Sequence, residues 1–203
     1  MLLPERLKNY RLILASQSPR RRRLMADAEM NYTLAENYDL EEIFPKGMVP
    51  KDVPVYLAEL KSAAYPKALA ADEILVTADT IVIVDGEVIG KPDGREGAIR
   101  MLGKLSGRRH EVITGVTLRN PALTKNFAAH SAVFFRTLNA EEIAYYVDRY
   151  RPFDKAGAYG IQEWIGYVGI ERIEGSFYNV MGLPVQMLYV ELSKMIDQLE
   201  NKP

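Results

Sequence analysis

Apolar and polar residues along this chain form segments that predict strands and helices in turn. A continuous apolar run at residues 11–15 predicts a buried strand, and residues 19–28 predict a helix with Pro19 at its first position. Further strands are expected at 31–35, 74–78, 81–84, 87–89, 111–119 and 127–137, and further helices at 53–65, 94–105, 140–150 and 184–199. Residues 37–50 and the glycine-rich residues 156–173 are expected to be irregular.

The order of these segments indicates the fold class. Helices and strands interleave, which is typical of an α/β protein. The Asp85-Gly86 pair between two β-rich runs predicts a two-residue hairpin turn. The long strands 111–119 and 127–137, joined by a short loop, argue against a purely parallel doubly wound sheet. We therefore expect an α/β fold with a long central mixed sheet flanked by helices.

Composition and charge narrow the classes of function. The chain has 203 residues, enough for one large domain or two lobes, and its formal net charge is −1. A dedicated nucleic-acid-binding protein is usually basic, so no nucleic-acid partner is expected. The sequence has no cysteine, which excludes disulfides, thiolate catalysis and cysteine-bound zinc. With only two histidines, any metal is expected to be a hard cation held by carboxylates and phosphate oxygens.

No segment predicts a membrane location. No apolar run approaches the length needed to cross a bilayer, and residues 1–11 lack the apolar core of a signal peptide. The absence of cysteine also leaves no sign of an oxidising compartment. We therefore expect a cytoplasmic protein without a membrane partner.

The most informative segment is residues 12–23, with the sequence LILASQSPRRRR. A strand here leads into a helix with Ser18 at its N-cap, so free backbone amides, hydroxyls and guanidinium groups come together. Helix N-termini favour anions, and arginine binds phosphate oxygens in a bidentate way. The alternative is a solvent-exposed basic patch or a targeting signal, but the buried strand before it argues against a mobile tail.

Two further segments carry charged residues at the ends of apolar runs. Asp79 lies between two β-rich runs, where a charge is seldom found unless it is paired or binds a metal; the alternative is an aspartate at a sheet edge that accepts a backbone hydrogen bond. Lys91 follows Gly90, but Asp85 and Pro92 do not fit the P-loop pattern. Lys91 remains a candidate for phosphate binding as a point charge, or an exposed turn lysine.

A fourth segment, residues 153–162 with the sequence FDKAGAYGIQ, combines small residues with polar ones. Small residues allow the backbone to approach a ligand closely. Gln162 offers both a donor and an acceptor, which suits the recognition of a base edge. The alternative is a connector rich in turns.

Together these segments resemble the Maf family of nucleoside triphosphate pyrophosphatases. The resemblance rests on the runs ASQSPRR at 15–21, ADTIV at 78–82, GEVIGKP at 86–92, LSGRRHEVIT at 105–114, DKAGAYGIQ at 154–162 and GSFYNVMGLP at 175–184. It covers residues 12–192, so we expect one domain over 1–203 with residues 1–10 as an N-terminal extension. The resemblance implies two lobes with an active-site cleft between them.

The resemblance also implies a reaction and roles for particular residues. The family hydrolyses a nucleoside triphosphate to the monophosphate and pyrophosphate with a divalent cation, Mg²⁺ or Mn²⁺. By resemblance, Asp79 is the catalytic proton acceptor and, with Glu42, a metal ligand. The resemblance implies that substrate specificity is determined by Arg20, Thr80 and Gln162. It implies that phosphate is bound by Ser16, Arg21, Lys61 and Lys91. The run at 155–162 resembles the sequence of this segment in the branch of the family that acts on dTTP and UTP. This implies a role in removing canonical or modified pyrimidine nucleotides.

Several alternatives stay open at this point. Glu41 competes with Glu42 as the site carboxylate, because the length of the acidic loop around residues 39–45 departs from the family pattern. A nucleotide-binding regulator of cell division with little turnover is the alternative to the enzyme, although a carboxylate beside a polyphosphate would be repulsive without a metal. A symmetric dimer is the commonest oligomer, but no segment marks an interface.

Overall fold

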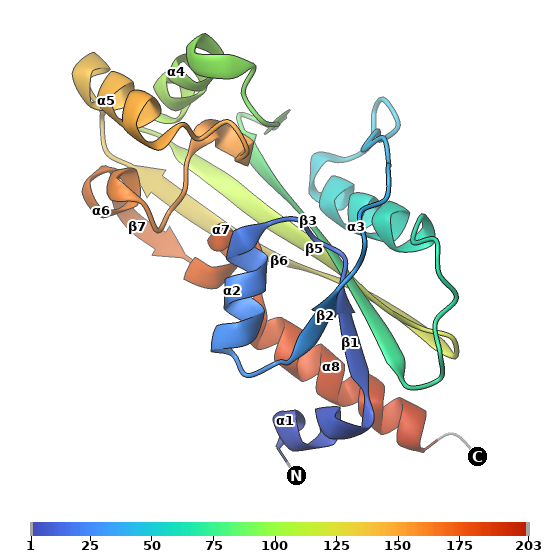
Figure 1. Ribbon diagram of the computed structural model, residues 1–203. Coiled ribbons are helices and arrows are strands. Elements are labelled where there is room, and N and C mark those ends of the chain that lie inside the picture. The colour runs from blue at the N-terminus through green and yellow to red at the C-terminus, as the bar shows by residue number, and fades with distance from the viewer. Residues whose placement is uncertain (1, 202–203) are drawn as a thin grey trace. The chain divides into compact units, whose positions relative to one another are not determined.

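The computed structural model describes residues 2–201 (Figure 1). Its strands are β1 (Arg11–Leu14), β2 (Tyr32–Leu34), β3 (Glu73–Val84), β4 (Glu87–Ile89), β5 (Arg109–Asn120), β6 (Leu123–Phe135) and β7 (Ile170–Glu174). Its α-helices are α1 (Leu3–Arg6), α2 (Pro19–Asp27), α3 (Val53–Ala63), α4 (Gly94–Leu105), α5 (Ala140–Tyr150), α6 (Trp164–Gly169), α7 (Phe177–Met181) and α8 (Val185–Glu200). Short 3₁₀ turns are η1 (Leu7–Asn9), η2 (Pro50–Asp52) and η3 (Ala156–Ala158).

The strands of the described residues form one mixed sheet. Its order is β2-β1-β3-β5-β6-β7, and β4 pairs with β3 outside this path. β1 is parallel to β2 and to β3, whereas β4 is antiparallel to β3 and β7 is antiparallel to β6. β5 and β6 are neighbours joined by only two residues, which an antiparallel pair allows and a parallel pair does not. The expected α/β class with a mixed central sheet is therefore confirmed.

Most expected elements are found within a few residues of their predicted bounds. Helix α3 ends at Ala63, before Pro66, whose ring cannot continue a helix. The two apolar runs on either side of Asp79 and Thr80 form one continuous strand, β3. The hairpin at Asp85-Gly86 is present, with both residues at positive φ, as a type I′ turn requires.

The expectation that residues 156–173 are irregular was wrong. This segment contains η3, helix α6 and most of strand β7. β7 exists because it pairs with β6, a partner far away in the sequence, so its local composition carried no strand signal. Helix α7 and the N-terminal helix α1 were also not expected; α1 buries Leu3 and forms ion pairs from Arg6 to Asp197 and Glu200 on α8.

Contacts divide the chain into two compact units. Unit 1 contains residues 1–79, 114–129 and 182–203, and one of its apolar clusters joins Ile13 and Ala15 to Leu75. Unit 2 contains residues 80–113 and 130–181. Its core packs α4 and α5 onto strand residues such as Val82, Val112 and Val133.

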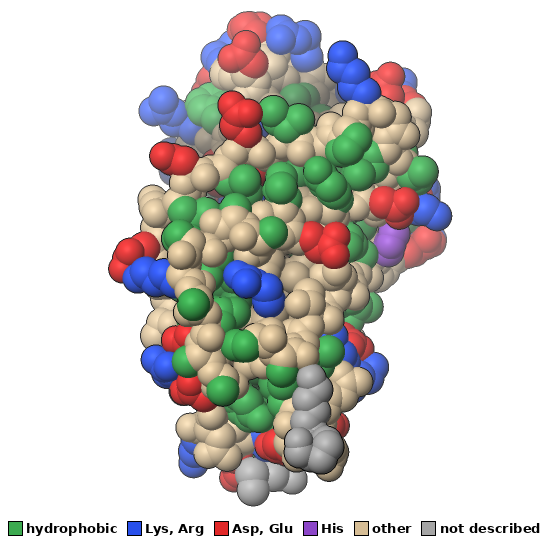
Figure 2. Space-filling model, turned by 90° about the vertical axis from the view of Figure 1, so that its right-hand side faces the viewer, with side chains coloured by type: hydrophobic (Ala, Val, Ile, Leu, Met, Phe, Trp, Pro, Cys, Tyr) green, Lys and Arg blue, Asp and Glu red, His purple; other side chains and the backbone are tan. Residues whose placement is uncertain are grey.

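The surface carries both signs of charge. Figure 2 shows acidic and basic side chains interspersed with apolar ones over the face that it presents, consistent with a net charge of −1. Within residues 2–201, none of the helices is both long and apolar enough to span a membrane.

Candidate functional site

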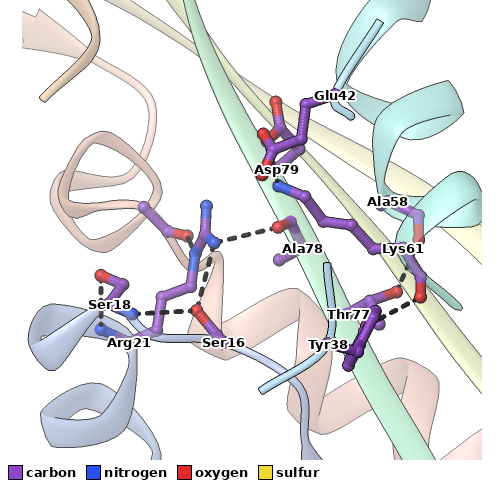
Figure 3. A network of polar contacts seen from close by, with 11 residues as sticks. Ser16, Ser18, Arg21, Tyr38, Glu42, Ala58, Lys61, Thr77, Ala78 and Asp79 are labelled. Atoms are coloured by element: carbon purple, nitrogen blue, oxygen red, sulfur yellow. Dashed lines mark hydrogen bonds and ion pairs between the residues drawn. The ribbon is translucent and has the colours of Figure 1, made fainter. Parts of the chain in front are cut away.

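The start of helix α2 in unit 1 is built as its sequence predicts. Ser18 is the N-cap, its hydroxyl accepts a hydrogen bond from the Arg21 backbone amide, and Pro19 occupies the first helical position. The Ser16 hydroxyl accepts from the Ser18 backbone amide at 3.3 Å and from Arg21 Nη1 at 3.4 Å. Ser16, Ser18 and Arg21 therefore form one polar cluster where the chain leaves β1 (Figure 3).

The Arg21 side chain crosses from α2 to β3. Its Nη1 donates to the Ala78 carbonyl oxygen at 2.9 Å, and its Nε donates to the Gly182 carbonyl oxygen at 2.7 Å. Burial lowers the pKa of the guanidinium, an effect that the carboxylate of Asp79 opposes. Arginine still keeps its charge, so Arg21 places a cation next to the segment that carries Asp79. Arg20, its neighbour on α2, is half-buried.

The Lys61 ammonium joins the two carboxylates expected at the site. Lys61 Nζ lies 2.6 Å from Asp79 Oδ1 and 3.0 Å from Glu42 Oε2 (Figure 3). The side chains of Asp79 and Lys61 are 11% and 14% exposed, so this ion pair is largely shielded from water. Glu41 is exposed, and its backbone carbonyl accepts from the Ile43 amide. The contacts thus link Glu42, rather than Glu41, to Lys61 and Asp79.

The last turns of helix α3, which carry Lys61, are held by three side chains that sequence reasoning missed. The Tyr38 hydroxyl donates to the Lys61 carbonyl oxygen at 2.8 Å, and Thr77 Oγ1 donates to the Ala58 carbonyl oxygen at 2.7 Å (Figure 3). Arg119 Nη2 donates to the Ser62 carbonyl oxygen at 2.7 Å. The carbonyls of Lys61 and Ser62 belong to the last turn, where a helix leaves its carbonyls without partners, so two of these bonds fix the helix end and the Thr77 bond holds the turn before it. No local sequence pattern signals them, because the donors come from three distant segments.

The remaining expected residues belong to unit 2. Thr80 follows Asp79 on β3 and is half-buried. Lys91 is exposed just after β4. The Gly157 backbone amide donates to the Gly90 carbonyl oxygen at 3.0 Å, so the segment before Lys91 is tied to the segment that leads to Gln162. Gln162 is half-buried, and its Oε1 is enclosed without a hydrogen-bond partner in the described part of the chain.

A buried polar network holds the residue next to Gln162. Glu163 accepts a hydrogen bond from the Tyr146 hydroxyl and pairs with Lys155 Nζ at 3.3 Å. The same Tyr146 hydroxyl accepts from the Gly160 amide at 2.9 Å. Burial, together with the bond to Glu163, raises the pKa of Tyr146, so its hydroxyl stays a donor. Lys155 was visible in the sequence motif, whereas the contact between Tyr146 and Glu163 was not.

The donor set fits a hard divalent cation. Asp79 Oδ1 and Glu42 Oε2 both approach one position, now taken by an ammonium group, and carboxylate oxygens are what Mg²⁺ and Mn²⁺ prefer. Among residues 2–201, no group of three or more His, Asp and Glu side chains is close enough to hold a metal by itself. A cation here would therefore need further oxygen ligands from a phosphate group or water.

A mixed α/β sheet that carries a carboxylate and a lysine, with an arginine from the first turn of a helix beside them, is typical of enzymes that act on phosphate compounds. The chain belongs to the Maf family, because the family model for Maf-like protein matches residues 11–195.

Curated relatives support this membership over nearly the whole chain. A dTTP/UTP pyrophosphatase from Bacteroides thetaiotaomicron is 51% identical over 189 residues, covering 93% of this chain and 98% of the relative. A dTTP/UTP pyrophosphatase from Porphyromonas gingivalis is 53% identical over 190 residues, covering 93% of this chain and 96% of the relative. A third, from Cytophaga hutchinsonii, is 47% identical and covers 94% of this chain and 87% of the relative.

Proposed function

We propose that this protein is a nucleoside triphosphate pyrophosphatase that hydrolyses dTTP and UTP to the monophosphate and pyrophosphate. The single observation that carries the proposal is the cluster of Asp79, Lys61 and Glu42 in a chain about half identical to named dTTP/UTP pyrophosphatases. A role in removing canonical or modified pyrimidine triphosphates follows from this activity.

In this proposal Asp79 accepts the proton of the attacking water. Its carboxylate is largely shielded from water and lies 2.6 Å from the Lys61 ammonium, and a positioned carboxylate of this kind is a common general base. Attack on the α-phosphorus breaks the α–β phosphoanhydride bond, and pyrophosphate leaves with the electron pair of that bond. No covalent enzyme intermediate is needed, and the chain has no cysteine that could form one.

Basic and hydroxyl groups hold the phosphate chain. We assign Ser16, Arg21, Lys61 and Lys91 to this role, since cations and hydroxyls oppose the negative charge that develops on the leaving pyrophosphate. Glu42 and Asp79 would hold Mg²⁺ or Mn²⁺, and a bound cation of this kind neutralises phosphate charge and polarises the phosphorus. We assign substrate choice to Arg20, Thr80 and Gln162. Gln162 Oε1 has no hydrogen-bond partner among residues 2–201, which supports a role in accepting a hydrogen bond from a base.

The setting of the enzyme is also part of the proposal. A cytoplasmic location is supported by the cysteine-free composition. The near-neutral charge argues against a nucleic-acid partner. A homodimer is the expected assembly because symmetric dimers are the commonest oligomers, and light scattering during size-exclusion chromatography measures it.

The decisive experiment is product analysis with Mg²⁺ and a panel of canonical and modified nucleoside triphosphates. We expect UTP and dTTP to give the monophosphate and pyrophosphate in equal amounts, with lower kcat/KM for purine triphosphates. Release of orthophosphate and a diphosphate would contradict the proposed bond cleavage. Tight binding of UTP without turnover would instead support a nucleotide-binding regulator.

A further inference from the structure

The position between Glu42 and Asp79 is already taken by a cation that belongs to the protein. Lys61 Nζ contacts Asp79 Oδ1 and Glu42 Oε2 at hydrogen-bonding distances. Figure 3 shows both carboxylates directed at this one nitrogen. Without it, two negative charges would lie close together, one of them in a largely buried side chain, which is unfavourable.

These contacts place Lys61 in competition with a divalent cation for the same oxygens. We propose that Lys61 is the resident counter-ion of the Glu42–Asp79 site, and that Mg²⁺ or Mn²⁺ binds there only when the ammonium moves to the phosphate chain of the nucleotide. This inference rests on the metal site assigned above to Glu42 and Asp79. It gives Lys61 two successive partners, carboxylates in the free protein and phosphate oxygens in the complex.

The structure restricts this exchange to the end of one side chain. The backbone of the last turns of α3 is held by Tyr38, Thr77 and Arg119 through the bonds described above. Helix α3 therefore does not need to move. The flexible four-carbon stem of lysine allows the ammonium to change partners while the backbone stays in place.

The exchange couples metal binding to nucleotide binding. Without phosphate, a metal that displaces Lys61 leaves a largely buried ammonium without an anion, which costs free energy. A triphosphate supplies that anion, so the two ligands should strengthen each other's binding by the same factor. We expect a factor on the order of 10 or more, the usual size of such coupling.

The test is a direct measurement of Mn²⁺ binding by electron paramagnetic resonance, without and with the α,β-methylene analogue of UTP. We expect Lys61→Met to bind Mn²⁺ about tenfold more tightly than the wild type when no nucleotide is present, and the analogue to raise the Mn²⁺ affinity by a smaller factor in Lys61→Met than in the wild type. Lys61→Arg keeps the charge and should bind Mn²⁺ as weakly as the wild type. A wild-type or weaker Mn²⁺ affinity in Lys61→Met would overturn the exchange.

Matched variants separate this inference from the metal assignment. Lys67→Met removes an exposed lysine that pairs with Glu36 elsewhere in unit 1, and it should leave Mn²⁺ binding unchanged. Glu42→Gln and Asp79→Asn should each weaken Mn²⁺ binding. If they do and Lys61→Met has no effect, the exchange alone fails; if neither weakens binding, the metal site itself is wrong. Should Lys61→Met not fold, Lys61→Gln provides the same comparison, since it also removes the positive charge.

Discussion

Lys61 Nζ lies 2.6 Å from Asp79 Oδ1, and this ion pair joins the last turns of helix α3 to the middle of strand β3. Hydrogen bonds to the backbone hold both partners of this ion pair in place. The Lys61 backbone is held by the Tyr38 hydroxyl, and the residue before Asp79 is held by Arg21. The protein thus holds, from two different elements, the two opposite charges that the proposed reaction needs.

Asp79→Asn removes the proposed proton acceptor and keeps nearly the same shape. We expect kcat for pyrophosphate release from UTP to fall by roughly 10²–10⁴, the usual contribution of general base catalysis. The control is Asp72→Asn, which removes a surface partner of Arg11 just before β3 begins and should keep the wild-type rate. Equal rates in the wild type and Asp79→Asn would exclude Asp79 as the base.

The choice between two neighbouring glutamates is open to a paired test. Both are exposed, but Glu42 Oε2 lies 3.0 Å from Lys61 Nζ, whereas within the described residues Glu41 forms no ion pair. We expect Glu42→Gln to raise the Mg²⁺ concentration for half-maximal activity by about tenfold or more, as loss of groups around a metal commonly does. Glu41→Gln should leave the Mg²⁺ titration unchanged. The reverse order would move the metal carboxylate to Glu41.

The network around Glu163 is expected to hold Gln162 in the orientation that distinguishes bases. Glu163→Gln removes the charge that Lys155 and Tyr146 bind, so the kcat/KM ratio of UTP to CTP should fall about tenfold, or about 1.4 kcal/mol. Glu171 is exposed on β7, and the control variant Glu171→Gln should leave this ratio unchanged. If Gln162→Ala changes the ratio and Glu163→Gln does not, Glu163 has no part in base selection.

Substitution by alanine should change the free energy of unfolding in opposite directions at two glycines with different surroundings. A Cβ on Gly115 in β5 would lie 2.3 Å from the backbone carbonyl carbon of Pro54, so Gly115→Ala must push α3 away from the sheet and should lower the free energy of unfolding by about 3 kcal/mol. Gly103 on α4 has open space around it, and Gly103→Ala should raise that free energy by about 0.5–1 kcal/mol. Urea denaturation measures both, and comparable stability of the two variants would contradict the close approach of α3 to β5.

His110 makes the stability of the fold depend on pH. It is 1% exposed, its Nε2 lies 2.7 Å from the Tyr159 hydroxyl, and burial, helped by Arg109, lowers its pKa to about 4. The unfolded chain takes up a proton near pH 6.5, before the folded protein does. The free energy of unfolding should therefore fall as the pH drops from about 6.5 to about 4, by about 3 kcal/mol in total.

Urea denaturation at several pH values tests this prediction. His110→Gln removes the titrating ring, so its unfolding free energy should depend less on pH than that of the wild type. His130 is the other histidine of the chain and is exposed, and His130→Gln should keep the wild-type dependence. An unchanged slope in His110→Gln would show that other groups cause the effect.

The sequence predicted those parts of the fold whose cause is local. Ser18 and Pro19 mark the start of α2, Pro66 follows the end of α3, and Asp85-Gly86 forms a hairpin, because caps and turns depend on the residues at the turn itself. Strand β7 was missed because a partner strand, not its own composition, makes it a strand.

The candidate site also has features that the sequence predicted and features that only the tertiary structure decided. Arg21 and Asp79 were evident from the sequence, because chemistry depends on side-chain type and the runs that carry them are distinctive. Lys61 lies outside those runs and was expected only from the resemblance to the family. Only the tertiary structure decided that Glu42 and Asp79 share the Lys61 ammonium, and that Tyr38, Thr77 and Arg119 hold the end of α3. Such contacts join segments far apart in the chain, so they exist only after the strands have paired and the helices have packed against them.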